Sequence, residues 1–379
     1  MSIQCRDIIR VIEQWAKPSL AEEWDNVGLH VGDPEQPVER IMLALTPSEA
    51  AIAAAVEQQA DMLVTHHPLL FKPIKAVTAQ SAAGRSIYQL VRNGVALYCA
   101  HTSLDAADGG VNDILAKALG LEKSRALIPA EAQSPWYKLV VYVPQGYEEI
   151  VRQAICAAGA GRTEGYYDNC TFRGAGTGTF RPLEGAEPFL GEAGEVNQVP
   201  EFRLETVVHR AQLEAVLTAM LAAHPYEEVA YDLFKLAPDP QQAGMGRIGT
   251  LPQAMPLERF LAQTARALQI EDIAFCGDRS RLVQTVALCG GSGSSFLKEA
   301  KRAGADVYVT GDMKYHDGQL AQELDLPVID AGHFATERLI LPIMAQHLQQ
   351  ALGLEQEQVW VWQDEEDFLQ HYHHIIQEG

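Results

Sequence analysis

Basic residues are scarce in this sequence. The chain carries 29 Lys and Arg against 50 Asp and Glu, which gives a formal net charge of −21 at pH 7. Such a charge repels nucleic acid and anionic lipid unless a local basic patch overrides it, and the sequence has no such patch. We therefore expect neither nucleic acid nor a membrane among its partners.

Long apolar runs and paired cysteines are also missing. No apolar stretch approaches the about 20 residues that span a bilayer. The segment MSIQCRDIIRVIEQW carries charges where a signal peptide would have its apolar core. The six cysteines form no C-x-x-C pair, which argues for reduced thiols and against a zinc ribbon or a disulfide framework. These absences predict a cytoplasmic protein.

Several common catalytic and binding signatures are absent. No G-x-S-x-G elbow follows a strand, so a Ser-His-Asp hydrolase is not indicated. The stretch CGGSGSSF (289–296) follows a predicted strand and opens a helix, and its amides could cradle a phosphate. It lacks the lysine of a P-loop, however, and a tight turn is the preferred interpretation. The stretch GAGTGTF (174–180) has no helix after it and fails as a dinucleotide fingerprint.

The chain is long enough for more than one domain. It has 379 residues, 47% of them hydrophobic, so disorder is not expected. Up to about residue 130, and again from about 256, helix-like segments alternate with strand-like ones, which predicts a mostly parallel sheet covered by helices. The predicted strands are 40–45, 61–65, 95–100, 283–291, 306–312, 327–333 and 358–363, and the predicted helices are 6–16, 48–59, 84–94, 109–120, 256–269, 294–304, 317–325 and 335–353.

The middle of the chain has a different order. Segments 136–145, 147–160, 170–185, 203–210, 212–223 and 228–236 read as strand, helix, strand, strand, helix and strand. This is the split βαβ, ferredoxin-like order, complete in itself. We therefore predict an α/β fold in which a discontinuous domain of two similar halves, 1–133 and 241–379, carries an inserted α+β domain at 134–240. Segments 130–135 and 237–246 are the expected linkers.

Side chains able to bind metal follow three predicted strands. They are His66 and His67, His101 and Asp105, and His333 and Glu337. In open α/β sheets ligands bind beyond the carboxyl ends of the strands, so these groups should converge. Adjacent histidines serve one small site only on an irregular turn, which Pro68 favours because it offers no backbone donor. The i, i+4 spacing places His333 and Glu337 on one helix face.

The donor set indicates two metal ions. His66, His67, Asp105, His333 and Glu337 make five ligands, more than a three-ligand zinc site requires and natural for two ions that share a carboxylate. Imidazole with carboxylate permits Zn, Fe, Mn, Co or Ni, and we expect zinc first. A lone histidine at a strand end is more often a hydrogen-bonded loop residue, but three converging strand ends favour the metal site.

Other candidate residues have less support. His101 can be a residue that supports the ligands, a proton shuttle or a packing residue. Asp312 and His316 follow another strand and should lie near the same crevice, although a helix cap explains Asp312 equally well. His101 and His316 are the candidates for moving protons. The stretch HPYEE (224–228) in the insert has no partner cluster, so a metal site there is the less favoured interpretation.

Five motifs together resemble a known family. They are EEWDNVGL (22–29), VTHHPLLF (64–71), AHTSLDAADGGVND (100–113), VTGDMKYHD (309–317) and DAGHFATE (330–337). Their order and combination are similar to the dinuclear-metal family typified by YqfO and YbgI, once labelled GTP cyclohydrolase I type II homologues. The insert, with YDNCTFRGAGTGTFRP (167–182) and HPYEEVAYDLFKL (224–236), resembles the PII/CutA-like domain of the longer members.

The resemblance implies a hexameric ring built from dimers, with two metal ions per subunit on the five residues that spacing had selected. One position departs from the pattern. In LALTPSE (43–49), Thr46 stands where many relatives have an Asp, so loss of a supporting carboxylate could weaken or retune the metal site.

Three functions remain open from the sequence. The first is a metal-dependent hydrolase, cyclohydrolase- or amidohydrolase-like, acting on an unknown small molecule. The second is a metal chaperone or metal-linked regulatory protein that uses the insert as a sensor. The third, with less support, is a scaffold with structural metals that is recognised by protein partners.

Overall fold

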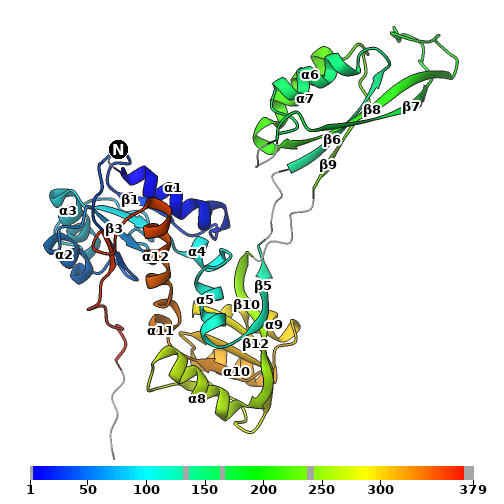
Figure 1. Ribbon diagram of the computed structural model, residues 1–379. Helices are drawn as coiled ribbons and strands as arrows, with labels where there is room; N and C mark the ends of the chain where they lie inside the picture. The colour runs from blue at the N-terminus through cyan, green and yellow to red at the C-terminus, as the bar shows by residue number, and fades with distance from the viewer. Residues whose placement is uncertain (1–2, 131–135, 163–166, 237–242, 371–379) are drawn as a thin grey trace, which may run out of the picture. The chain divides into compact units, whose positions relative to one another are not determined.

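The computed structural model describes residues 3–130, 136–162, 167–236 and 243–370 (Figure 1). Contacts divide the chain into two compact units, which are described separately. Unit 1 comprises Met1–Glu131 and Gln241–Gly379, and unit 2 is Ala132–Pro240. Most residues of the two expected linkers, 130–135 and 237–246, lie outside the described residues. The second linker ends earlier than expected, because Gly244 already begins a strand of unit 1. No helix within the described residues is long and apolar enough to cross a membrane.

The first sheet of unit 1 has five strands in the order β1-β4-β3-β2-β15. All pairs are parallel except the edge pair β1–β4. The strands are β1 (Gly28–Val31), β2 (Ile41–Ala44), β3 (Met62–Thr65), β4 (Ala96–Cys99) and β15 (Val359–Val361). Strands β2, β3 and β4 are buried at every position, as expected for parallel strands covered on both faces.

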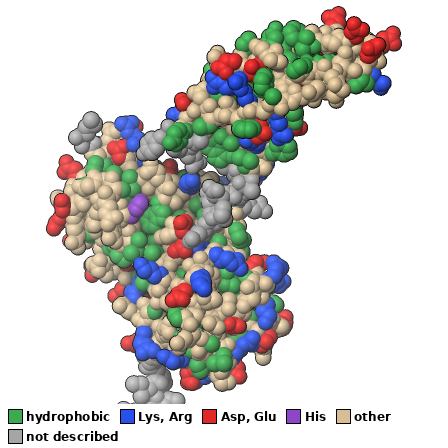
Figure 2. Space-filling model, turned by 45° about the vertical axis from the view of Figure 1, so that its right-hand side comes forward, with side chains coloured by type: hydrophobic (Ala, Val, Ile, Leu, Met, Phe, Trp, Pro, Cys, Tyr) green, Lys and Arg blue, Asp and Glu red, His purple; other side chains and the backbone are tan. Residues whose placement is uncertain are grey.

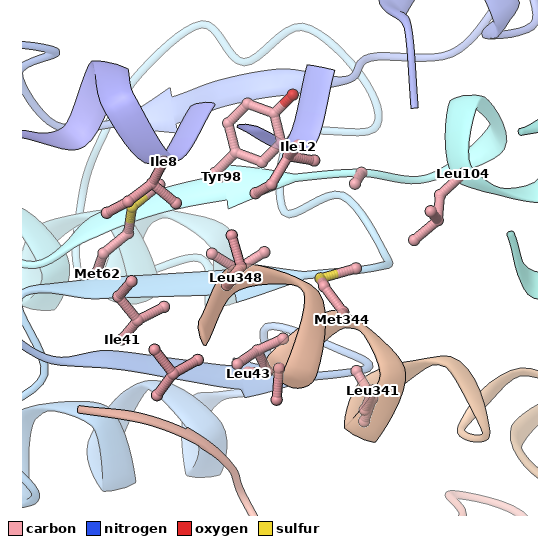
Figure 3. Close-up of a cluster of buried hydrophobic side chains, with 14 of the residues drawn as sticks. Ile8, Ile12, Ile41, Leu43, Met62, Tyr98, Leu104, Leu341, Met344 and Leu348 are labelled. Carbon is pink, nitrogen blue, oxygen red and sulfur yellow. The ribbon is translucent and has the colours of Figure 1, made fainter. Parts of the chain in front are cut away.

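Helices cover both faces of this sheet. Helices α1 (Cys5–Trp15) and α12 (Ile340–Leu352) pack on one face, and α2 (Glu49–Glu57) and α3 (Ala82–Asn93) pack on the other. Figure 3 shows the first of these cores, in which Ile8 and Ile12 of α1 and Met344 and Leu348 of α12 meet Tyr98 of β4. These side chains are at most 2% exposed, so this layer is dry.

The second sheet of unit 1 has six strands in the order β11-β14-β13-β12-β10-β5. Only β12, β13 and β14 are parallel neighbours. The strands are β5 (Glu122–Pro129), β10 (Gly244–Pro256), β11 (Ala274–Cys276), β12 (Leu282–Ser292), β13 (Val307–Gly311) and β14 (Val328–Asp330). Helices α5 (Val111–Ala118) and α8 (Leu257–Leu268) pack on one face, and α9 (Leu297–Arg302) and α10 (Tyr315–Glu323) on the other.

The two chain segments of unit 1 are interlocked. From the first segment, strand β5 joins the second sheet and helix α5 packs on it. From the second segment, strand β15 joins the first sheet and helix α12 packs on it. A buried ion pair joins the segments again: Arg247 of β10 is fully buried and donates two 2.6 Å hydrogen bonds to Asp113 of α5. Each segment therefore needs the other to complete its core.

Unit 2 contains one four-stranded antiparallel sheet in the order β7-β8-β6-β9. Its elements are β6 (Trp136–Pro144), α6 (Glu148–Ala157), β7 (Thr171–Phe180), β8 (Asn197–His209), α7 (Leu213–Ala223) and β9 (Tyr231–Lys235). Helices α6 and α7 pack together on one face through a single apolar core. Strand order and element order are those of the split βαβ arrangement.

The mixed α/β class expected from the sequence is confirmed, but the details differ in three ways. Unit 1 holds two sheets where one mostly parallel sheet was expected. Strands β1, β5, β10 and β11 were not predicted. The helix predicted at 335–353 is divided into α11 (His333–Glu337) and α12, because the ring of Pro342 is incompatible with the carbonyl of Arg338 in a continuous helix. Short elements complete the list: η1 (Pro18–Leu20), α4 (Thr102–Ala106), η2 (Arg210–Gln212) and η3 (Ser294–Phe296).

Candidate metal centre

The histidine pair lies on the turn that follows β3. His66 is fully buried and the side chain of His67 is 20% exposed, and Pro68 ends the turn as expected. Strand β4 lies beside β3 in parallel, so His101 and the short helix α4 with Asp105 emerge at the same edge. Helix α11 of the second segment brings His333 and Glu337 to this edge. The carboxyl ends of strands from two sheets therefore face one another, where the sequence had suggested one sheet.

One group of ligand atoms is deeply buried. The Nε2 atom of His66 lies 3.5 Å from Oδ1 of Asp105 and 3.8 Å from Oε1 of Glu337. Both His66 Nε2 and Asp105 Oδ1 are buried and have no hydrogen-bond partner among the described residues. Leaving a buried polar atom unsatisfied costs about 1–3 kcal/mol, and more for a charged group. A cation between these atoms would satisfy them both.

A second group lies beside the first. The Nε2 atoms of His67 and His333 are 2.9 and 3.1 Å from Oε2 of Glu337, and 3.1 Å from each other. Glu337 thus presents Oε1 to one group and Oε2 to the other, the arrangement of a carboxylate shared by two ions. Each set of three residues has its ligand atoms within 4.8 Å of one another. Each of the two groups has the donor atoms and the spacing to hold a metal ion.

Every histidine of the cluster is held by its other ring nitrogen. Nδ1 of His66 lies 3.0 Å from the carbonyl of Ala100, and Nδ1 of His67 lies 2.8 Å from Oγ1 of Thr46. Nδ1 of His101 lies 2.9 Å from Oδ1 of Asp25, and Nδ1 of His333 lies 2.7 Å from Oδ2 of Asp312. A hydrogen bond of this kind holds the ring in place and directs Nε2 away from the supporting group. The four imidazoles are therefore oriented as metal-binding histidines are.

Two of these partners had been noticed in the sequence and one had been missed. Thr46 occupies the position where a carboxylate had been expected, and Asp312 lies near the crevice as predicted. Asp25 lies within the motif EEWDNVGL (22–29), which does not indicate its role. Its carboxylate is buried and also accepts hydrogen bonds from the amide (3.0 Å) and the hydroxyl (2.5 Å) of Thr102. The motif gave no sign that Asp25 holds His101, because the two residues are 76 positions apart.

The two buried carboxylates control the charge of the cluster. Burial lowers the pKa of His66, but Asp105 and Glu337 outweigh it and raise that pKa to about 9. Burial opposes a similar change at His333, where Glu337 and Asp312 raise the pKa to about 10. Burial would raise the pKa of Glu337, yet the neighbouring imidazoles hold it well below its usual range. Burial raises the pKa of Asp105 to about 6. The negative charge of the carboxylates therefore favours positive charge in the space between the imidazoles.

The glycine-rich turn after β12 makes room for Glu337. Gly291 has φ +61°, and a Cβ there would lie 2.0 Å from Oε1 of Glu337 and 3.3 Å from Nε2 of His333. Its amide donates to the hydroxyl of Thr336, and the amide of Gly293 donates to Thr310. These amides are already satisfied, so the preferred reading of CGGSGSSF as a tight turn fits better than a phosphate cradle.

Two other histidines lie elsewhere. His316 stands on the first turn of α10, is exposed and contacts Oε1 of Gln319 at 3.4 Å, and it belongs to none of the close groups of ligand atoms. Its part in proton transfer stays a prediction. His224 of unit 2 is buried, with Nε2 3.0 Å from the carbonyl of Tyr142 and Nδ1 accepting from the amide of Tyr226. Both of its nitrogens are used within the fold.

A small aromatic hollow lies beside the cluster. It measures about 320 Å³ and is lined by Trp24, Asn26, Leu70, Phe71, Lys72, Pro73 and Ile74. Trp24 is 57% exposed, and its ring lies 5.6 Å from Phe71 and 6.1 Å from His101. The side-chain amide of Asn26 donates to the carbonyl of Leu70 at 2.6 Å, which ties the two loops together. Exposed rings next to such a cluster offer a contact surface for a small molecule.

Comparison with known proteins places this arrangement in a family. The model of Duf34/NIF3 (NGG1p interacting factor 3) matches residues 3–367. The chain belongs to the Duf34/NIF3 family. This confirms the resemblance seen in the motifs, since the relatives carry the name "GTP cyclohydrolase 1 type 2 homolog".

Relatives of this Duf34/NIF3 chain match it over most of its length. The one from Bacillus subtilis is 43% identical over 334 residues, covering 88% of this chain and 89% of the relative. The one from Mycobacterium tuberculosis is 40% identical over 342 residues, covering 89% of each. A solved structure of a Bacillus cereus protein related to NIF3 has a TM-score of 0.74 and 36% identity, covering 98% of this chain and all of that one. Staphylococcus aureus SA1388 has a TM-score of 0.82 and 26% identity, covering 98% and 99%.

Proposed function

We propose that this protein is a metal-dependent hydrolase with two divalent ions in each chain. The observation that carries the proposal is the placement of Glu337, which offers one carboxylate oxygen to each of two ligand groups. His66 and Asp105 would hold one ion with Glu337, and His67 and His333 would hold the other. Paired divalent ions supply Lewis-acid polarisation and lower the pKa of water toward neutrality.

Zinc is the first choice of metal in this proposal. Imidazole with carboxylate suits zinc, but also Fe, Mn, Co and Ni. The absence of a thiolate among the proposed ligands removes the softest metals from consideration. Thr46 supports His67 with a neutral hydroxyl, whereas the carboxylate of Asp312 supports His333. An ion held by these two histidines would therefore have one weakly and one strongly polarised imidazole.

We assign proton transfer to His101. Its ring lies 5.3 Å from that of His66 and 5.7 Å from that of His67. Asp25 accepts the Nδ1 proton of His101, which leaves Nε2 as the basic nitrogen on the side of the cluster. This orientation supports the shuttle over the packing interpretation left open by the sequence, and a ring nitrogen of His101 also lies within 4.8 Å of ligand atoms of His66 and His67.

The substrate class stays broad in the proposal. The relatives' name, "GTP cyclohydrolase 1 type 2 homolog", supports hydrolysis of a ring amide or a related bond in a small molecule. The hollow beside the cluster, with Trp24 and Phe71 exposed, would hold part of such a molecule. The expected reaction is therefore cyclohydrolase- or amidohydrolase-like.

Metal stoichiometry tests the proposal directly. Apo protein would be loaded with Zn²⁺ or Mn²⁺, freed of excess metal and measured by inductively coupled plasma mass spectrometry. We expect two ions per wild-type chain, one in Asp105→Ala, one in His333→Ala and none held tightly in Glu337→Ala. Glu271→Gln, at an exposed loop position, is the control and should match the wild type. One ion per wild-type chain, or two ions retained in Glu337→Ala, would overturn the dinuclear proposal.

Turnover tests the hydrolase itself. The loaded protein would be screened against nucleotides, cyclic amides and peptides, with Glu337→Ala and metal-free protein as controls. Activity that survives in Glu337→Ala would refute the assignment of the centre.

A metal chaperone or metal-linked regulator is the second candidate. It is favoured by unit 2, which is a complete domain with its own core. Among the described residues, none of the clustered ligand atoms lies in unit 2. We propose that unit 2 is a PII/CutA-like sensor domain and that the chain assembles as a hexamer, because its element order supports the first and the family resemblance the second. Fast transfer of metal to an apo acceptor without turnover would favour this candidate, and slow exchange with turnover would favour the hydrolase.

A further inference from the structure

Unit 2 contains a cavity that the proposed function does not use. It has a volume of about 530 Å³, within the range of small-molecule sites, which is roughly 300–1,000 Å³. Its walls are the end of β7, the segment 181–190 that follows it, Glu201 of β8 and the segment 226–230 before β9. All of these lie within unit 2, so the cavity is complete without unit 1.

Aromatic rings form one wall of the cavity. The ring of Tyr226 lies 6.3 Å from those of both Phe180 and Phe189. Phe189 also packs edge-on against Tyr147 at 5.4 Å, which fixes the segment after β7 over the cavity, yet Phe189 remains 46% exposed. Three large rings around an open space can contribute cation–π attraction as well as apolar contact.

Carboxylates dominate the charge of the cavity. Glu201, Glu227 and Glu228 line it against a single Arg181. The hydroxyl of Tyr226 donates to Oε1 of Glu201 at 2.9 Å, and no ion pair among the residues that the structure describes neutralises any of the three carboxylates. More acidic residues follow in the β7–β8 loop, and Figure 2 shows acidic side chains gathered at one end of this unit.

The position of Glu201 depends on a glycine. A Cβ at Gly178 of β7 would lie 2.0 Å from Oε2 of Glu201, so any larger residue there would displace the carboxylate. Glu227 is held as well, because its carboxylate accepts the amide of Glu187 at 3.2 Å and so ties the 181–190 segment to the opposite wall. The acidic groups are thus positioned around the rings by the fold of unit 2 itself.

We propose that this cavity binds an organic ammonium cation. Aromatic faces next to carboxylates recognise ammonium and quaternary ammonium groups, because the cation is attracted by both. The excess of carboxylates over Arg181 disfavours anions such as phosphate and carboxylic acids. The proposal is independent of the metal centre, since no residue of the cavity belongs to the metal cluster.

Isothermal titration calorimetry on the full chain tests the proposal, with choline, tetramethylammonium and putrescine as probes. The matched control ligand is 3,3-dimethylbutan-1-ol, which has the shape of choline without its charge, and benzoate tests for an anion site. The variants are Glu201→Gln and Glu228→Gln, and Glu214→Gln on the exposed side of α7 is the control variant. Glu228 is exposed, so its substitution leaves the fold intact even if Glu201→Gln does not.

We expect at least one cation to bind with a Kd below about 10 mM, and choline to bind about 3- to 30-fold tighter than its neutral isostere. Glu201→Gln and Glu228→Gln should each weaken the cation, and Glu214→Gln should not. Equal binding of choline and the isostere, binding of benzoate in place of the cations, or no cation binding below about 10 mM would overturn the proposal.

Discussion

Replacing Gly291 by alanine gives the sharpest test of the candidate metal centre. The new Cβ would lie 2.0 Å from Oε1 of Glu337, and real Cβ contacts are essentially never shorter than 3.0 Å. The difference, 3.0 − 2.0 = 1.0 Å, is the least distance that the carboxylate or the turn must move. The substitution also places a side chain at φ +61°, which costs about 1–2 kcal/mol for a residue with a Cβ.

Two effects of this substitution can be separated by a matched glycine. Gly353 ends α12 with φ +66° and has nothing within 4 Å of its added Cβ, so Gly353→Ala carries the backbone strain alone. Gly353→Ala should cost about 1–2 kcal/mol in urea denaturation of the apo protein, and Gly291→Ala should cost at least as much because Glu337 or the turn must also move. Only Gly291→Ala should bind metal more weakly. We expect its affinity to fall by about 10- to 100-fold, as is typical when the groups that position a ligand are disturbed.

The assay is equilibrium dialysis against buffered Zn²⁺, with bound metal measured in parallel with apo stability. Retention of both ions by Gly291→Ala at wild-type affinity would refute the prediction that the space at Gly291 holds Glu337 in its binding position. Equal metal loss in Gly353→Ala would mean that general destabilisation, and not the position of the carboxylate, controls binding.

Three further substitutions test the surroundings of the site. Arg247→Met should cost about 3–5 kcal/mol in the free energy of unfolding, because it leaves Asp113 without its buried partner, and an unchanged urea midpoint would contradict this. The pKa of Asp25 lies below its ordinary 3.8 because hydrogen bonds outweigh burial, so its stabilisation is present above pH 3.8 and is lost as the pH falls. Asp25→Asn should therefore destabilise the protein at pH 7 in urea denaturation, and the difference from the wild type should shrink only as the pH falls well below 3.8. Thr46→Val removes the partner of His67 Nδ1 and should weaken one of two ions by about 10- to 100-fold in calorimetry, whereas equal weakening of both would argue against separate groups.

The convergence of ligand-type residues followed from a simple rule. Parallel strands β3 and β4 end at the same edge, so His66 and Asp105 had to lie near each other once the strands were recognised. The short spacing of His333 and Glu337 likewise required only a helical turn. These relations are local or follow from strand order, and for that reason a single sequence carries them.

Other features depend on contacts that no local pattern records. Strand β10 begins with GMGRIGT, whose glycines resemble a loop, and it is a strand because β5 and β12 pair with it on both sides. The amides of Leu45 and Thr46 donate to Glu365, about 320 residues away in the sequence. The role of Gly291 depends on its distance from Glu337, which only the packing of α11 against β12 determines.

The position of the cluster has a consequence for stability. His66, His67 and Asp105 come from the first segment of unit 1, and His333 and Glu337 come from the second. An ion held by residues of both segments would therefore crosslink them. Ligand binding to the folded state alone stabilises it by RT ln(1 + [L]/Kd), about 4 kcal/mol at a thousandfold excess over Kd. Unit 2 holds none of these ligands and has a separate core, so the stabilisation belongs to unit 1. Metal and the cation proposed for unit 2 should therefore raise the stability of different parts of the same chain.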